Sequence, residues 1–148
     1  MKRHRRAVRS LESLKNAASR LALYIGASTD HLPFFDKCTD IRWLYVGVAY
    51  VEIKRRKYHW VFTERGIESR EAFDCAEDLL FKVFSNITHN TASKFAASRP
   101  DKDTDFRRVM FAKQIELLGV IDCCWAARRS AEIDQILYHH HHPYRDRE

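Results

Sequence analysis

Residues 43–53 read WLYVGVAYVEI, and this stretch decides the fold class. Aromatic and β-branched side chains dominate it, which is typical of a β-strand. Residues 58–63 read YHWVFT and carry an aromatic ring at every second position. The basic connection Lys54 to Lys57 between the two runs has hairpin length but no Asn-Gly or Asp-Gly pair, so the turn type stays open. We therefore predict a small antiparallel sheet or hairpin over about residues 43–64.

Helical periodicity begins on the N-terminal side of these strands. Apolar residues recur at steps of three and four over residues 6–26, from Ala7 to Ile25, and polar residues occupy the other faces. This spacing predicts a long amphipathic N-terminal helix with one buried stripe. Gly26 is the expected stop.

The chain returns to helical periodicity after Gly66. Ser69 is a candidate N-cap for a long helix that runs to Phe95 or beyond. Another long helix is expected from near Thr104 to a break at residues 128–130, followed by a short C-terminal helix. The predicted fold class is therefore α+β and mainly helical.

Composition and length are those of one globular domain. The 148 residues are 45% hydrophobic and 31% charged, with only four glycines and three prolines. The net charge of +6 belongs mostly to a basic arm, residues 1–9, because the rest of the chain has 21 basic and 20 acidic residues. We predict a single domain over residues 1–148, with this arm at one end and a flexible tail over residues 139–148 at the other.

The location predicted for the chain is the cytoplasm. The best apolar run, Leu21 to Ile25, is far too short to span a bilayer, and charged residues interrupt the stretch where a signal peptide would lie. No membrane partner is expected. The four cysteines contain no CxxC pair, and in a reducing compartment free buried thiols are the default. Cys123 and Cys124 fall in the apolar rows of the last long predicted helix, where core packing is the simplest interpretation.

No set of residues predicts catalysis. The phosphate-binding, metalloprotease and serine-hydrolase motifs are missing from the sequence. Cys75 lies on the first turns of a predicted helix and His89 lies fourteen residues later on it, roughly 21 Å away at about 1.5 Å per residue, so they cannot pair. We predict no catalytic residue, no enzyme activity, no cofactor and no small-molecule ligand. A cysteine-dependent enzyme stays as a third hypothesis, which loss of activity on thiol alkylation would test.

The tail contains four consecutive histidines, His139 to His142. Structural metal sites usually take spaced ligands from a folded frame, and a consecutive run supplies such ligands poorly. We predict no functional metal site.

Basic residues favour one alternative function. Residues 2–9 and 54–57 are basic, and Tyr58 and Trp60 follow the second of these clusters. A basic hairpin turn of this kind could contact phosphates, which makes a small regulatory nucleic-acid-binding protein the alternative hypothesis. The competing interpretation is a solvated turn between two half-buried strands.

Acidic residues favour a protein partner. Residues 64–78 contain six acidic residues and two arginines. On the predicted helix, Glu71, Asp74 and Asp78 recur at steps of three and four, opposite the apolar stripe. Together with Glu68 they form the candidate docking surface for a basic protein partner. An ordinary solvated helix face is the competing interpretation.

Several short motifs along residues 57–146 resemble one protein family. In chain order they are Tyr58-His59, Glu64-Arg65-Gly66, Arg107-Arg108 with Phe111 and Gln114, Leu117-Leu118, Trp125, Ile136-Leu137, His142-Pro143-Tyr144 and Asp146. In this order they resemble an immunity protein of bacterial polymorphic toxin systems, most closely the family numbered sixty-three. Residues 1–42 add nothing to the resemblance, which also leaves the histidine run and the basic arm unexplained.

The resemblance implies a protein that binds a cognate toxin domain, as in contact-dependent inhibition, and has no active site. Under it, Glu68, Glu71, Asp74 and Asp78 are our candidate toxin-binding residues. Glu64 or Asp122 could also pair with Arg107 or Arg108 as a structural polar pair, outside the toxin interface.

Overall fold

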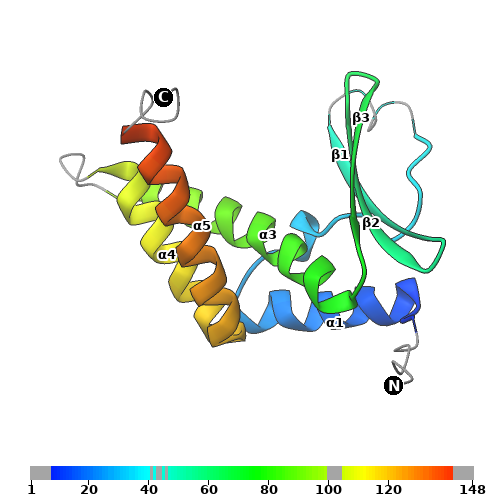
Figure 1. The fold of residues 1–148 in the computed structure, drawn as a ribbon, viewed down its shortest axis with the longest axis horizontal. Helices are drawn as coiled ribbons and strands as arrows, with labels where there is room; N and C mark the ends of the chain where they lie inside the picture. Colours follow the sequence, from blue (N-terminus) through cyan, green and yellow to red (C-terminus); the bar gives the residue numbers. More distant parts are fainter. Residues whose placement is uncertain (1–7, 41, 43–44, 46, 100–104, 142–148) are drawn as a thin grey trace, which may run out of the picture. The chain divides into compact units, whose positions relative to one another are not determined.

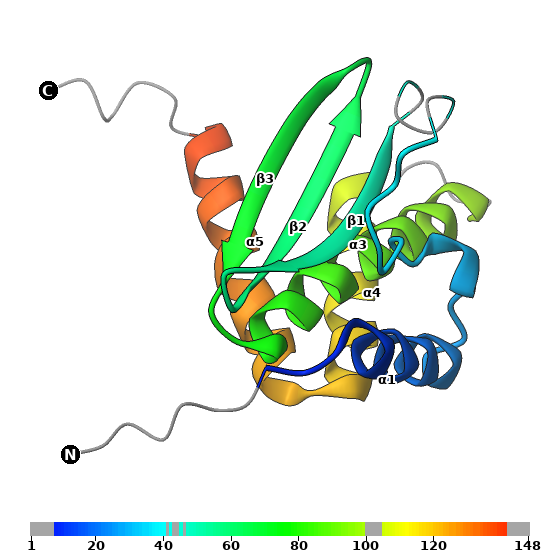
Figure 2. The ribbon, with the colours of Figure 1, turned by 90° about the vertical axis from the view of Figure 1, so that its right-hand side faces the viewer.

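The computed structural model describes residues 8–40, 42, 45, 47–99 and 105–141 (Figures 1 and 2). Most of the predicted basic arm, part of the first predicted strand (43–44 and 46), residues 100–104 and the end of the tail (142–148) lie outside the described residues. The chain divides into two compact units, residues 1–83 and residues 84–148, and each is presented by itself.

The first unit begins with α1 (Leu11–Tyr24), which confirms the N-terminal helix but is shorter than predicted. Ser10 sets its start, because the Ser10 hydroxyl accepts the N–H of Ser13 at 3.1 Å. The helix buries one face, with Leu14, Ala18 and Ala22 fully buried at steps of four. Gly26 follows in the left-handed conformation (φ 70°) and ends the helix as predicted. A 3-10 turn, η1 (Thr29–His31), comes next.

The sheet of the first unit has three antiparallel strands in the order β1-β2-β3: β1 (Val48–Lys54), β2 (Lys57–Glu64) and β3 (Ile67–Phe73) (Figure 2). Both connections are two-residue turns in the left-handed conformation. They contain Arg55 and Arg56 (φ 52° and 64°), then Arg65 and Gly66 (φ 51° and 78°). This is the hairpin geometry that usually selects Asn-Gly, so arginine occupies strained positions in both turns.

The two faces of β1 and β2 are both buried in part, as the apolar character of the first strand predicts. Val51 and its partner Trp60 are buried on one face, and Tyr50 and its partner Val61 are buried on the other. The outer edge of β1 is covered by the backbone of Phe34, which donates to Ala49 and accepts from Val51.

The prediction that a helix starts at Ser69 is wrong. Ser69 lies in β3, opposite Phe62 of β2, and the next helix, α3 (Ala76–Ser98), begins seven residues later. The first six residues of β3 are exposed, so this strand has none of the apolar alternation that marks a half-buried strand. Pairing of its backbone with β2 across a tight turn decides its conformation.

The second unit contains α3 from Phe84 onward, α4 (Phe106–Ile121) and α5 (Cys123–His141). The α4 and α5 helices pack side by side (Figures 1 and 2). Their core includes Ala92, Met110, Phe111 and Ile133. Asp105 caps α4 by accepting the N–H of Arg107 at 3.0 Å.

Two predictions about the C-terminal helices are wrong. The last helix is not short, because α5 has 19 residues and runs through residues 128–130 without a break. The break lies at Asp122 instead, which ends α4 and caps α5. The α5 helix also includes His139, His140 and His141, the first residues of the predicted tail. Among the described residues, no helix is both long and apolar enough to cross a membrane.

Candidate functional site

The four predicted toxin-binding residues do not share a helix face. Glu68 and Glu71 lie on β3, Asp74 lies in the bend after it, and Asp78 lies in the first turn of α3. Because successive residues of a strand point to opposite faces, Glu68 and Glu71 point away from each other. The prediction of one acidic helix face is therefore wrong, and the residues instead surround the outer strand of the sheet.

Basic side chains balance most of this acidic charge. Glu68 pairs with Arg70 at 3.1 Å, and Arg70 also donates to Glu52 on β1. Glu71 pairs with Lys82 at 3.2 Å. Asp74 pairs with Lys57 at 3.4 Å. Exposed pairs of this kind contribute little stability, but they leave the surface close to neutral and not strongly acidic.

The pair between Glu52 and Arg70 is the least exposed of these ion pairs. The Arg70 guanidinium holds the pKa of the Glu52 carboxyl below its usual value, against the opposing effect of burial. Hydrogen bonding to Glu52 in turn raises the pKa of Arg70. Glu52 and Arg70 therefore stay ionised at neutral pH and connect β1 to β3 across one face of the sheet.

The outer edge of β3 has no neighbouring strand among the described residues. Ile67, at the start of β3, is 76% exposed, and Phe62 beside it on β2 is 38% exposed. Ile67 and Phe62 point to the same face, because Phe62 pairs with Ser69, two residues after Ile67. An open edge with exposed apolar side chains next to it can pair with an extended segment of another protein.

The sequence predicted that Glu64 or Asp122 pairs with Arg107 or Arg108, and the structure excludes Asp122. Asp122 lies fifteen residues after Arg107, at the far end of α4, which is about 22 Å at about 1.5 Å per residue. Asp122 therefore pairs with neither Arg107 nor Arg108. The guanidinium of Arg107 lies over the ring of Phe111 instead, 5.8 Å from its centroid. Glu64 is the last residue of β2, and its pairing with either arginine stays a prediction.

A buried polar network in the second unit was missed from the sequence. Gln114 on α4 is fully buried, and its amide donates to the carbonyl of Ser85 at 2.9 Å and to the hydroxyl of Thr88 at 3.3 Å, both on α3. Arg129 on α5 donates to the Gln114 amide oxygen at 3.2 Å and to Glu132 at 2.9 Å. Burial and the charge of Arg129 lower the pKa of His89. Gln114 thus joins three helices. In the sequence it is a single glutamine in an apolar row, which does not indicate a polar network.

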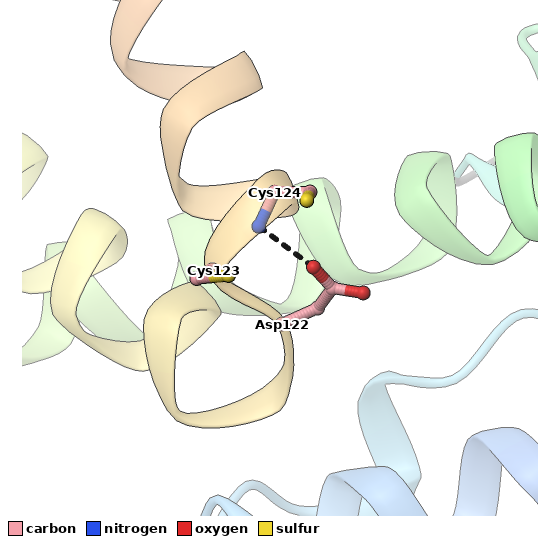
Figure 3. Close-up of side chains that lie close together, drawn as sticks. All are labelled: Asp122, Cys123 and Cys124. Atoms are coloured by element: carbon pink, nitrogen blue, oxygen red, sulfur yellow. Dashed lines mark hydrogen bonds between the residues drawn. The ribbon is translucent and has the colours of Figure 1, made fainter.

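The cysteines of the second unit differ from the prediction. Cys123 and Cys124 are exposed at the start of α5, and not packed in the core. The core interpretation assumed a continuous helix, but the break at Asp122 turns both side chains outward. One ligand atom each of Asp122, Cys123 and Cys124 lie within 4.8 Å of one another (Figure 3). The neighbouring Cys123 and Asp122 raise the pKa of the Cys124 thiol.

The hairpin turn of the nucleic-acid hypothesis is exposed and basic from Lys54 to Lys57. Tyr58 and Trp60 are buried, so they are not available to stack on bases. The basic turn therefore remains accessible to phosphates, but the two aromatic side chains of that hypothesis do not.

Part of the chain matches the model of a known protein family. The family model described as Immunity protein 63 matches residues 54–135, from the last residue of β1 into α5. No curated protein and no solved structure matches the chain.

Proposed function

The chain belongs to the Immunity protein 63 family, and we propose on this basis that it neutralises a cognate bacterial toxin domain by binding it directly. The observation that carries the proposal is the family match over residues 54–135, which include two of the three strands and most of the three helices that follow. Proteins of this kind are typically non-enzymatic. We propose that the chain acts by occupying the toxin, in the cytoplasm of the cell that makes it.

Our proposed interface is the outer surface of the sheet around β3. Ile67 and Phe62 supply exposed apolar area there, and the outer edge of β3 pairs with no other strand in the part of the chain that the structure describes. The predicted residues Glu68, Glu71, Asp74 and Asp78 surround this strand. In this proposal the apolar and backbone groups supply affinity, and the charged rim influences the rate of association.

The test needs the cognate toxin domain, which this proposal expects to be encoded in a neighbouring reading frame as the C-terminal domain of a large secreted protein. Co-expression should restore the growth of cells that produce that domain, and the purified proteins should form a complex on size-exclusion chromatography. If growth is not restored and no complex forms, direct neutralisation is refuted. Binding to duplex nucleic acid that weakens steeply with salt, in place of toxin binding, would support the alternative function.

A matched pair of variants tests the interface. Ile67→Asp should weaken toxin binding at least tenfold, because it places a charge among the apolar groups of the interface, while Leu23→Asp should leave it unchanged. Both side chains are strongly exposed, at 76% and 69%, so neither substitution disturbs the core. Equal effects of the two substitutions would show that the toxin does not bind at β3.

A further inference from the structure

The junction between α4 and α5 holds its side chains in a fixed arrangement. The backbone N–H of Asp122 donates to the carbonyl of Leu118 at 2.9 Å and so closes α4. One carboxylate oxygen of Asp122 accepts the N–H of Cys124 at 2.7 Å (Figure 3). The same oxygen accepts the N–H of Trp125 at 3.4 Å. These bonds orient the carboxylate beside the first turn of α5.

Two exposed thiols follow this carboxylate directly. Cys123 and Cys124 are both exposed, although free cysteine is among the most buried residue types. Burial therefore does not explain either side chain. The chemistry of a thiol, which includes metal binding and oxidation, is the property that an exposed pair retains.

The three side chains are close enough to share one ion. Their ligand atoms lie within 4.8 Å of one another. Around a tetrahedral zinc ion, with bonds of about 2.3 Å to sulfur and about 2.1 Å to oxygen, ligand atoms lie about 3.5 to 3.8 Å apart. Small rotations of exposed side chains cover the difference. No other group of three such side chains was found among the described residues.

We propose that Asp122, Cys123 and Cys124 form a binding site for a thiophilic divalent ion of the zinc class. Two sulfur ligands select soft and borderline ions over Mg²⁺ and Ca²⁺. Three protein ligands leave one position of a tetrahedral ion open to water or to another group. The bound ion connects the residue between the two helices to the first turn of α5. This site departs from the sequence-based prediction of no metal, which rested on the histidine run. Asp122, Cys123 and Cys124 are also consecutive, but they lie at a helix break where the cap bonds orient the Asp122 carboxylate beside the two thiols.

The experiment is a titration of the full-length chain with Cd²⁺, followed by the ultraviolet charge-transfer absorption of thiolate–cadmium bonds. This absorption reports sulfur ligands alone, so ions on His139 to His142 do not contribute to it. We expect saturation at one ion per chain. Zn²⁺ should displace the Cd²⁺, and it should raise the melting temperature of the unsubstituted chain.

Variants assign the ligands. Cys123→Ser and Cys124→Ser should each weaken Cd²⁺ binding at least tenfold, whereas Cys38→Ser and Cys75→Ser are matched thiol controls that should bind as the unsubstituted chain does. Asp122→Asn should weaken binding and yet keep the helix cap, because asparagine is as good a cap as aspartate. Far-UV circular dichroism checks that each variant is folded.

Three results would overturn the proposal. The first is the lack of thiolate–cadmium absorption in the folded, reduced chain. The second is undiminished absorption in the Cys123→Ser and Cys124→Ser variants. The third is loss of the absorption in the Cys38→Ser or Cys75→Ser control, which would place the ion elsewhere.

Discussion

Replacing Gln114 with leucine should destabilise the second unit by about 3 kcal/mol. The buried amide makes two hydrogen bonds to neutral groups on α3 and one to the Arg129 guanidinium. Neutral hydrogen bonds contribute about 1 kcal/mol each and a charged one about 2 kcal/mol, so about 4 kcal/mol is lost. The more apolar leucine side chain restores roughly 1 kcal/mol.

The assay is urea unfolding followed by far-UV circular dichroism. Gln114→Leu should lower the midpoint and leave the slope with denaturant unchanged. Glu116→Gln, on the exposed side of the same helix, is the control and should change stability by less than about 0.5 kcal/mol. A loss below about 0.5 kcal/mol for Gln114→Leu would refute the view that this network holds the three helices together.

A double substitution sharpens this test. Arg129→Met alone removes the charged donor to the Gln114 amide oxygen. Gln114→Leu combined with Arg129→Met should cost less than the sum of the single substitutions, because each single substitution already removes the hydrogen bond between Gln114 and Arg129. Strict additivity would show that the Gln114 and Arg129 side chains act independently.

Three further outcomes follow from other parts of the structure. Arg70→Met should cost about 1 kcal/mol at pH 7 in urea unfolding. Arg70 lowers the pKa of Glu52 in the folded chain from its usual value of 4.5, so the pair stabilises the fold above pH 4.5. This stabilisation is lost as the pH falls through the lowered pKa. On acidification the Arg70→Met variant should therefore lose less stability than the unsubstituted chain. Arg55→Asn combined with Arg56→Gly should raise stability by about 1 kcal/mol in thermal unfolding, since both positions have positive φ. Asp122→Ala should cost about 1 kcal/mol in urea unfolding through loss of the α5 cap, while Asp122→Asn costs only a few tenths.

Local patterns in the sequence were enough for several elements. The apolar stripe predicted α1 and the aromatic alternation predicted β2, because each pattern repeats with the period of its own element. The observed helix is shorter than the predicted one because Ser10, just after the basic arm, caps it and sets its first residue at Leu11. Gly26 and Asp105 acted at the helix ends as their residue types indicate.

Pairing between strands, which local sequence patterns do not show, determined the conformation of residues 67–73. Residues 67–73 carry Ser69 and two glutamates ahead of a helical stripe, which locally favours a helix start. Their conformation depends on the tight turn at Gly66 and on pairing with β2. This single difference moved Glu68 and Glu71 from a helix face to the two faces of a strand, and the candidate docking surface changed with them.

The helix break at Asp122 was missed for a related reason. Aspartate is a strong N-cap residue, but apolar residues on both sides of it continued the helical period closely enough to hide the break. Because the predicted helix continued through Asp122, Cys123 and Cys124 were assigned to the core. Gln114 gave no local signal, because its partners lie on α3 and α5.

Affinity for the proposed cognate toxin domain is the measurement that tests the account most directly. Isothermal titration calorimetry should give a tight one-to-one complex, with affinity reduced at least tenfold by Ile67→Asp and unchanged by Leu23→Asp. No heat of binding from a folded, active toxin domain, together with unimpaired toxin activity in the presence of excess chain, would contradict it.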